Sequence, residues 1–155
     1  MTEPSSASDT NPKKIVAFRL GDEEYGIDIL AVREIRSWTP TTAIPRSPAY
    51  VRGVINLRGA VLPVVDLGAR LGMELREVSK DDVIIVIESN GRLIGLLVDA
   101  VSDILMVDDG NFLPTPEVPS ADIARFIASV VTIDDRMIQL VATSSILEDG
   151  SARAA

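Results

Sequence analysis

The apolar residues of this chain fall in short runs separated by turn residues, a pattern that predicts β-strands. Runs rich in valine, isoleucine and leucine, the residues that favour sheets, occupy residues 14–20, 53–57, 60–65, 82–87, 93–98, 126–133 and 137–142. Residues 25–27 and 33–38 are also expected to be extended. Three pairs of runs are joined by hairpin turns, at Arg58-Gly59, at Asn90-Gly91 and at residues 134–136. The chain is therefore expected to be mostly β.

Helical signals are few and short. Asp28 can cap one helical turn that runs to residue 32, and Asp66 precedes a short helix that Gly72 can end. A serine-capped helix is expected at residues 144–148. Residues 39–48 hold three prolines and are expected to form a loop, and residues 118–125 are expected to form a loop with one helical turn. Polar tails at residues 1–12 and 149–155 leave one domain over residues 13–148.

The chain also contains an internal repeat. A shift of 69 positions carries Tyr25 onto Ile94 and aligns Gly26 with Gly95, and a shift of 76 carries Tyr50 onto Phe126. A unit present only twice predicts two similar modules related by pseudo-symmetry rather than a solenoid. Each set of about five strands is expected to form one small barrel, closed so that no strand edge is free. Two such modules packed side by side would leave a groove between them.

Composition and charge exclude several classes of function. The chain of 155 residues has no cysteine and no histidine, so disulfides, thiolate metal sites, imidazole bases and phospho-accepting histidines are absent. Its net charge of −8 argues against nucleic-acid binding. No apolar run approaches the ~20 residues that span a bilayer, and the N-terminus lacks an apolar signal sequence, so a cytoplasmic protein is expected.

Carboxylates are the main candidates for catalysis that remain. Asp66 and Asp99 each follow an apolar run, and if they face each other they could form a hydrolase or a small-ligand-binding barrel. Both can equally accept hydrogen bonds in turns. The acidic runs at residues 22–24, 81–82 and 108–109 lack the spacing of a calcium loop. We therefore expect no enzyme activity, no metal and no cofactor, with the carboxylate site as the alternative.

Two apolar pairs recur at equivalent positions of the repeat. Val32 with Ile35, and Val101 with Ile104, are each spaced by three residues, and Glu34 matches the acidic Asp103. Both pairs could pack in the core. They could also line a cleft between the modules, where an amphipathic partner helix would lay its apolar face.

Arg58 is unusual because hairpin turns more often carry Asn-Gly or Asp-Gly. The turn here is Asn56-Leu57-Arg58-Gly59, between strands more apolar than a half-solvated pair requires. Arg58 could be a solvated turn residue, or its guanidinium could fork onto a carboxylate across a subdomain or partner boundary.

Several motifs together resemble one known family. The segments at residues 20–29, 44–67, 95–105 and 134–141, among them YGIDI, GVINLRG and GLLVD, resemble the chemotaxis coupling proteins of the CheW family over roughly residues 14–148. The resemblance implies two SH3-like β-barrels of five strands each, with a few short helices. Ser129 departs from the glycine usual in the family at that position.

The resemblance also implies function. Such proteins are non-enzymatic adaptors that join the cytoplasmic tip of transmembrane chemoreceptors to the regulatory domain of the chemotaxis histidine kinase. They are cytoplasmic and recruited to membrane-associated receptor arrays, without nucleic-acid binding or membrane insertion. The implied receptor groove comprises Val32, Glu34, Gly53, Val83, Gly95, Val101 and Ile104. The implied kinase and assembly surface comprises Ile27, Ile29, Arg58 and Gly59.

Overall fold

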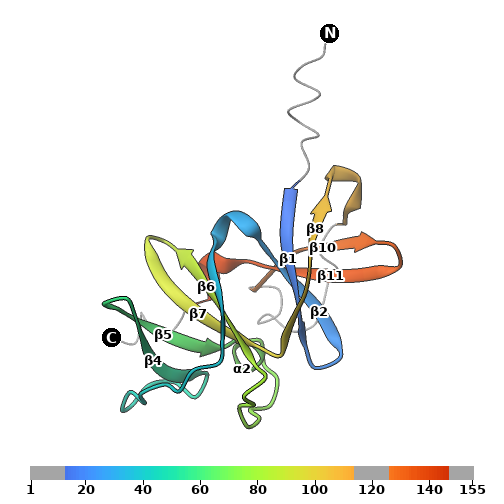
Figure 1. The fold of residues 1–155 in the computed structure, drawn as a ribbon. Helices are drawn as coiled ribbons and strands as arrows, with labels where there is room; N and C mark the ends of the chain where they lie inside the picture. The colour runs from blue at the N-terminus through green and yellow to red at the C-terminus, as the bar shows by residue number, and fades with distance from the viewer. Residues whose placement is uncertain (1–12, 114–125, 147–155) are drawn as a thin grey trace.

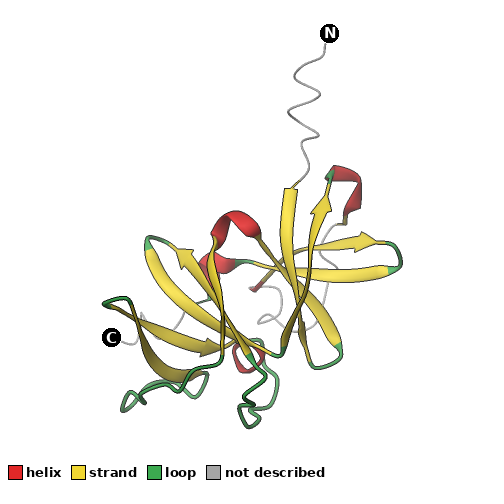
Figure 2. Ribbon diagram, viewed as in Figure 1, coloured by secondary structure: helices red, strands yellow, loops and turns green. Residues whose placement is uncertain are grey.

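A computed structural model describes residues 13–113 and 126–146 of the chain. In these ranges strands dominate, as Figures 1 and 2 show, and the expectation of a mostly β fold is confirmed. The strands are β1 (Lys13–Leu20), β2 (Glu23–Asp28), β3 (Val32–Ser37), β4 (Val51–Leu57), β5 (Ala60–Asp66), β6 (Val83–Ser89), β7 (Arg92–Val98), β8 (Ala100–Val107), β9 (Phe112–Leu113), β10 (Ile127–Ile133) and β11 (Arg136–Val141). The helical segments are η1 (Ile29–Ala31), α2 (Leu67–Arg70), η2 (Asp109–Asn111) and η3 (Thr143–Ser145).

The strands form two curled sheets, which lie side by side in Figure 1. The terminal sheet has the order β8-β1-β2-β11-β10-β9, and the central sheet has the order β3-β6-β7-β5-β4. Neighbouring strands are antiparallel except in the pairs β2·β11 and β5·β7, which are parallel. When repeat-equivalent strands are matched, the first five strands of the terminal sheet have the same order as the central sheet.

The two sheets do not correspond to the two sequence repeats. The first repeat supplies β1 to β5, yet the terminal sheet pairs its β1 and β2 with β8 and β11 of the second repeat. In the same way β3, β4 and β5 join β6 and β7 in the central sheet. The cause is local: only η1 separates β2 from β3, and only Asp99 separates β7 from β8, so the chain crosses to the other sheet instead of turning back. The expectation of two small barrels is confirmed by these two sheets, but the assignment of one repeat to each barrel was wrong, because the repeats exchange strands.

The largest cluster of buried apolar residues lies between the two sheets, and we call it the shared core. It comprises Val16, Phe18, Leu20, Tyr25, Ile27, Val65, Leu67, Leu71, Ile85, Ile87, Ile94, Leu96, Val98, Phe126, Ile127, Val141 and Ile146. Each sheet also encloses a smaller cluster of its own. On β1 and β6, successive residues alternate between the shared core and the enclosed cluster, which explains why both strands are continuous apolar runs.

The predicted turns are confirmed. Arg58 and Gly59 have φ values of 54° and 91°, and Asn90 and Gly91 have values of 54° and 79°, the positive φ that two-residue hairpins need. The Asp66 side chain accepts a hydrogen bond from the Ala69 backbone N–H at 3.2 Å and so begins α2.

Other expectations need correction or lie outside the described residues. Strand β8 was not predicted, because most of its residues are at least partly exposed and give no continuous apolar signal. At residues 144–148 the described part is a 3₁₀ turn, η3, without a side-chain cap. The tails at residues 1–12 and 149–155, and the expected loop at residues 118–125, lie outside the described residues.

The sheets are also less closed than expected. Among the described residues, no backbone pairing joins β3 to β4, the two edge strands of the central sheet. An ion pair spans this opening instead, because Arg58 in the β4–β5 turn contacts Glu34 on β3 at 2.7 Å. The barrel end is thus closed by side chains.

A buried arginine holds the two repeats together. The guanidinium of Arg70 lies 4.3 Å from the ring centre of Tyr50 and 4.6 Å from that of Phe126, and its Nε donates to the Ile146 carbonyl at 2.7 Å. The shift of 76 positions relates Tyr50 to Phe126 and Arg70 to Ile146. Arg70 therefore lies where equivalent parts of the two repeats meet, stacked between planar rings that suit a guanidinium.

Replacing Arg70 by lysine should destabilise the protein by about 1–3 kcal/mol, because the charge stays but the planar stacking and the Nε hydrogen bond are lost. The free energy of unfolding in urea measures this effect. Arg33→Lys is the matched control: that side chain is 47% exposed and pairs with Glu88 at the surface, so a change within about 0.5 kcal/mol is expected. Equal effects of the two substitutions would contradict the role of Arg70.

Candidate protein-binding surface

The edge strands β3 and β8 present apolar side chains that continue the shared core to the surface. In the β3·β6 register, Val32 pairs with Ile87 and Ile35 with Ile85, two residues of the shared core. Paired residues point to the same side of a sheet, so Val32 and Ile35 face the shared core.

The same arrangement recurs on β8, where Val101 pairs with Phe18 and Ile104 with Val16. The register of β8 shifts at Ser102, and that of β3 shifts at Arg33, the position equivalent to Ser102. A β-bulge adds one residue, so side chains three positions apart fall on one face. The three-residue spacing seen in the sequence therefore comes from a repeated bulge.

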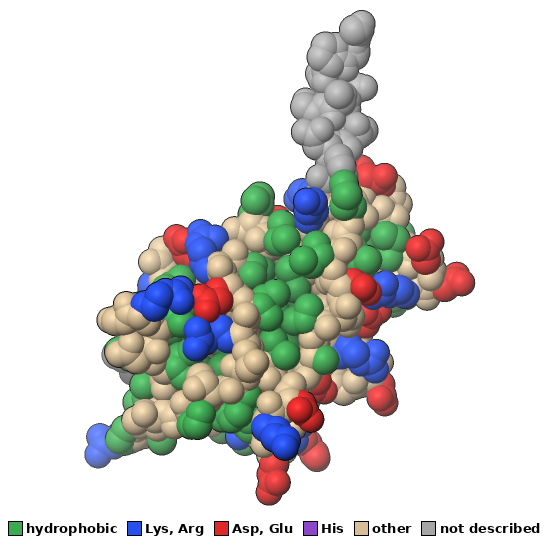
Figure 3. Space-filling view, in the orientation of Figure 1, with side chains coloured by type: hydrophobic (Ala, Val, Ile, Leu, Met, Phe, Trp, Pro, Cys, Tyr) green, Lys and Arg blue, Asp and Glu red, His purple; other side chains and the backbone are tan. Residues whose placement is uncertain are grey.

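These four residues form what we call the seam surface: Val32, Ile35, Val101 and Ile104. Val32 and Val101 are half-buried and pack against the shared core, whereas Ile35 is 43% and Ile104 58% exposed. Figure 3 shows apolar side chains gathered at the centre of this face, between the places where β3 and β8 lie in Figure 1. The interior of the seam is filled, and its open margin at β3 and β8 is apolar.

The remaining groove residues inferred from the sequence have different positions. Val83 is half-buried and packs against the shared core. Glu34 pairs with Val86 and so faces the inside of the central sheet. Ile35 is part of the seam surface but not of the receptor groove implied by the family resemblance. The repeated apolar pairs in the sequence had already made it a candidate for the cleft.

Gly53 and Gly95, the two glycines of the expected receptor groove, are buried, and close packing explains why glycine stands at both positions. A Cβ on Gly95 would lie 2.9 Å from Ile84 Cγ2, and one on the equivalent Gly26 would lie 3.1 Å from Ile138 Cγ2. Gly53 has a φ of 140°, and a Cβ there would lie 2.5 Å from the Thr42 carbonyl oxygen. Gly53 and Gly95 therefore shape β4 and β7 and have no side chain to offer a partner.

Two isoleucines of the expected kinase surface differ in exposure. Ile27 is fully buried in the shared core, because β2 is paired on both edges and covered on both faces. A partner cannot reach its side chain, which corrects the expected role of Ile27. Ile29 lies in η1, half-buried against the same core.

Arg58 and Glu34 form an ion pair at the end of the central sheet. Arg58 Nη2 donates to Glu34 Oε1 at 2.7 Å, and Arg36 Nη1 donates to Glu34 Oε2 at 2.8 Å. These two arginines, Arg58 first, lower the pKa of the Glu34 carboxyl. Arg58 thus reaches a carboxylate through a single hydrogen bond within its own sheet, not across a subdomain boundary, and its side chain remains 72% exposed.

The repeat-equivalent acid, Asp103, has an arginine partner as well. Arg136 Nη2 lies 3.0 Å from Asp103 Oδ2, and Arg136 also binds both oxygens of Glu24, at 2.9 and 2.6 Å. The hydrogen bond from Arg136 is the main cause that lowers the pKa of Glu24. In both sheets, then, an arginine at the end of a hairpin reaches an acid on β3 or β8.

The carboxylates of the alternative hydrolase hypothesis line one cavity of about 200 Å³, yet both are engaged. Asp66 accepts from Ala69 N–H on one oxygen and from Arg52 on the other, at 3.0 and 2.7 Å. Asp99 accepts from Gly21 N–H at 2.8 Å and from Arg76 at 2.5 Å. Every carboxylate oxygen of the pair has a donor, so the geometry supports the role of caps and turn acceptors.

The chain is similar to known proteins in both sequence and fold. A family model described as CheW-like domain matches residues 14–151. The chain is 49% identical to the chemotaxis protein CheW of Rhizobium meliloti (strain 1021) over 155 residues, all of both chains, and 50% identical to a probable chemotaxis protein CheW of Rhizobium etli over 143 residues, 92% of each. It is also similar to the crystal structure of the scaffolding protein TtCheW from Thermoanaerobacter tengcongensis, with a TM-score of 0.83, 39% identity and coverage of 89% of this chain and 94% of that one.

Replacing Arg58 by methionine should raise the pKa of Glu34 toward its ordinary value, because Arg58 is the first cause of its lowering. A group whose pKa is lowered on folding stabilises the fold above its unfolded pKa and loses this contribution as the pH falls through its folded pKa. The ion pair should thus stabilise the fold at neutral pH and lose this contribution at acidic pH.

An NMR titration of the Glu34 carboxyl carbon tests this expectation. Arg33→Met is the control, since Arg33 pairs with Glu88 rather than with Glu34. An unchanged Glu34 titration in Arg58→Met would show that the pair does not form in solution.

Proposed function

The chain belongs to the CheW-like family of chemotaxis adaptors, and from this premise we propose that it couples the cytoplasmic tip of chemoreceptors to the regulatory domain of the chemotaxis histidine kinase. Its action would be geometric. Two binding surfaces on one body hold receptor and kinase in a fixed register, so that a conformational bias of the receptor reaches the kinase.

The seam surface is the observation that supports this proposal. It places four apolar side chains along the two facing edges β3 and β8, and two of them are exposed. A narrow apolar strip between two sheets suits the apolar face of an amphipathic helix, whose anchor residues recur every three or four positions. We therefore assign the receptor tip to this surface, with Val83 beneath it and Glu34 on the opposite side of β3.

The kinase regulatory domain is assigned to the end of the central sheet that carries Arg58. The β4–β5 turn projects there, and Arg58 keeps most of its side chain in solvent while Glu34 fixes its direction. A held, exposed guanidinium is a suitable anchor for a protein interface. Gly59 supplies the second positive φ that this turn requires. Ile29 can contribute a half-buried apolar contact.

The proposal assigns no catalytic step to the chain. The carboxylates that could have supported one, Asp66 and Asp99, are held by Arg52 and Arg76. We further propose that the protein acts in the cytoplasm, at receptor arrays. None of the helices in the described part of the chain is long and apolar enough to cross a membrane.

Replacing Ile104 by aspartate should weaken binding of a receptor tip at least about tenfold and leave binding of the kinase regulatory domain unchanged, because a charge would enter the apolar strip. Isothermal titration with each purified partner measures both affinities. Met137→Asp is the matched control: Met137 is 63% exposed, compared with 58% for Ile104, and lies on β11 of the same sheet, outside the seam surface. If the variant lost kinase binding and kept receptor binding, the seam surface would be assigned to the kinase instead of the receptor.

Reversing the charge of Arg58 with glutamate should weaken the ternary assembly about tenfold or more, because it removes an anchor and places two acids together. Pull-down of receptor tip and kinase domain together measures this effect, and circular dichroism checks the fold. Arg92→Glu, on the other exposed hairpin of the same sheet, is the control. A folded Arg58→Glu variant that recruits the kinase normally would remove Arg58 from the interface.

A further inference from the structure

A second candidate site lies at another margin of the shared core, away from β3 and β8. A cavity of about 450 Å³ opens between strands β2, β10 and β11 and the segment that follows α2. This volume is within the roughly 300–1,000 Å³ of typical ligand pockets. Its lining shares no residue with the seam surface or with Arg58 and Glu34, so binding at this cavity does not depend on the proposed function.

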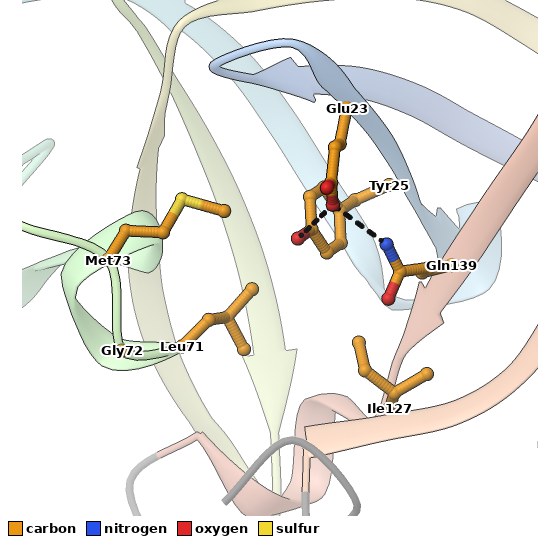
Figure 4. A pocket seen from close by; sticks show the side chains of 7 residues that line it. All are labelled: Glu23, Tyr25, Leu71, Gly72, Met73, Ile127 and Gln139. Carbon is orange, nitrogen blue, oxygen red and sulfur yellow. Dashed lines mark hydrogen bonds between the residues drawn. The ribbon is translucent and has the colours of Figure 1, made fainter. Parts of the chain in front are cut away.

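The cavity has one polar wall and one apolar wall. Figure 4 shows Glu23, Tyr25 and Gln139 together on one side, with Leu71 and Met73 across from them and Ile127 nearby. Tyr25, Leu71 and Ile127 belong to the shared core, and Met73 packs against it. The apolar wall is therefore built into the folded body of the protein.

The Glu23 carboxylate is held in place by neutral donors. Its Oε1 accepts from the Tyr25 hydroxyl and from Gln139 Nε2, each at 3.1 Å. Burial, and then the neighbouring Glu23, raise the pKa of Tyr25 to about 12, so the hydroxyl keeps its proton at neutral pH. Two donors fill the lone pairs of Oε1 and leave Oε2 as a fixed acceptor.

Glu23 has no cationic partner among the described residues, unlike Glu24 beside it on β2. Glu24 pairs with Arg136, whereas the Glu23 carboxylate accepts only from the neutral Tyr25 hydroxyl and Gln139 amide. A negative charge oriented at the mouth of a cavity and left unpaired favours a positively charged occupant.

The polar trio is also not a consequence of the repeated fold. The shift of 69 positions carries Glu23 onto Arg92 and Tyr25 onto Ile94, and the shift of 76 carries Pro63 onto Gln139. The other sheet has the same backbone arrangement with an arginine, an isoleucine and a proline there. The trio is thus present in the terminal sheet and not at the equivalent positions of the central sheet.

We propose that this cavity binds a lysine side chain of a partner protein. The ammonium group meets the Glu23 carboxylate, with the Gln139 carbonyl oxygen as a further acceptor, and the methylene stem packs on Leu71, Met73 and Ile127. A single free carboxylate oxygen suits a compact ammonium better than a guanidinium, which binds best to two oxygens. The net charge of −8 favours the approach of such a basic segment.

A peptide titration on the full-length protein tests the proposal. The probe is a capped pentapeptide with a central lysine flanked by leucines, and its neutral match carries an acetylated lysine. Proton–nitrogen NMR follows the Gln139 side-chain amide and the Gly72 backbone amide, both at the cavity. Saturating shifts with the lysine peptide, and at least about tenfold weaker binding of the acetylated one, are expected.

Glu23→Gln should weaken the lysine peptide about tenfold while the rest of the spectrum stays unchanged, because glutamine keeps an acceptor but loses the charge. The neighbouring acid Asp22 does not line the cavity, so Asp22→Asn should bind normally. No shift up to about 10 mM peptide, or equal shifts with both peptides, would overturn the proposal. Basic residues of this chain outside the described residues, such as Arg125 and Arg153, are the alternative occupants. If Arg125→Gln or Arg153→Gln shifts the Gln139 amide without peptide, the cavity binds a segment of this chain and the proposal is overturned.

Discussion

The exchange of strands between the two repeats is the constraint on which the rest of this structure depends. Because β2 leads into β3 and β7 leads into β8 with almost no connecting chain, each repeat contributes to both sheets. The two sheets must then face each other, and the shared core fills the space between them. Neither sheet can be completed by half of the chain, so the two barrels form one cooperative body. A rigid body of this kind can hold two partners in register.

The exchange of strands also determines which sheet edges remain exposed. The strands that cross over, β3 and β8, become sheet edges, and their repeated bulges turn an extra apolar residue toward the shared core. Ile35 and Ile104 lie at the margin and remain partly exposed. On the other face of β3, Glu34 ties this strand to the Arg58 hairpin. The two proposed partner surfaces therefore share strand β3, so a displacement of β3 would move residues of both surfaces.

Local signals in the sequence were sufficient for local structure. Asn90-Gly91 and Arg58-Gly59 fixed their turns, because few residue pairs adopt positive φ twice, and the repeated apolar pairs marked the seam. Long-range pairing was not accessible in this way. Nothing local distinguishes a strand that turns back from one that crosses over, so the exchange, the strand β8 and the burial of Ile27 emerged only from the structure. The cavity at Glu23 was missed for the same reason, since its residues come from distant segments.

The pseudo-symmetry of the two sheets holds for their frameworks and not for the turns at their ends. At one pair of identical positions, Gly26 and Gly95, packing leaves no room for a side chain, and at two others the valines and isoleucines of the seam surface recur. Positions at the ends of the sheets are free to diverge: the hairpin that carries Arg58-Gly59 in one sheet carries Asp134-Asp135 in the other. Equivalent turns with opposite charge cannot bind the same surface equally well. Packing thus keeps the two frameworks alike, while the exposed turns differ in charge between the two barrels.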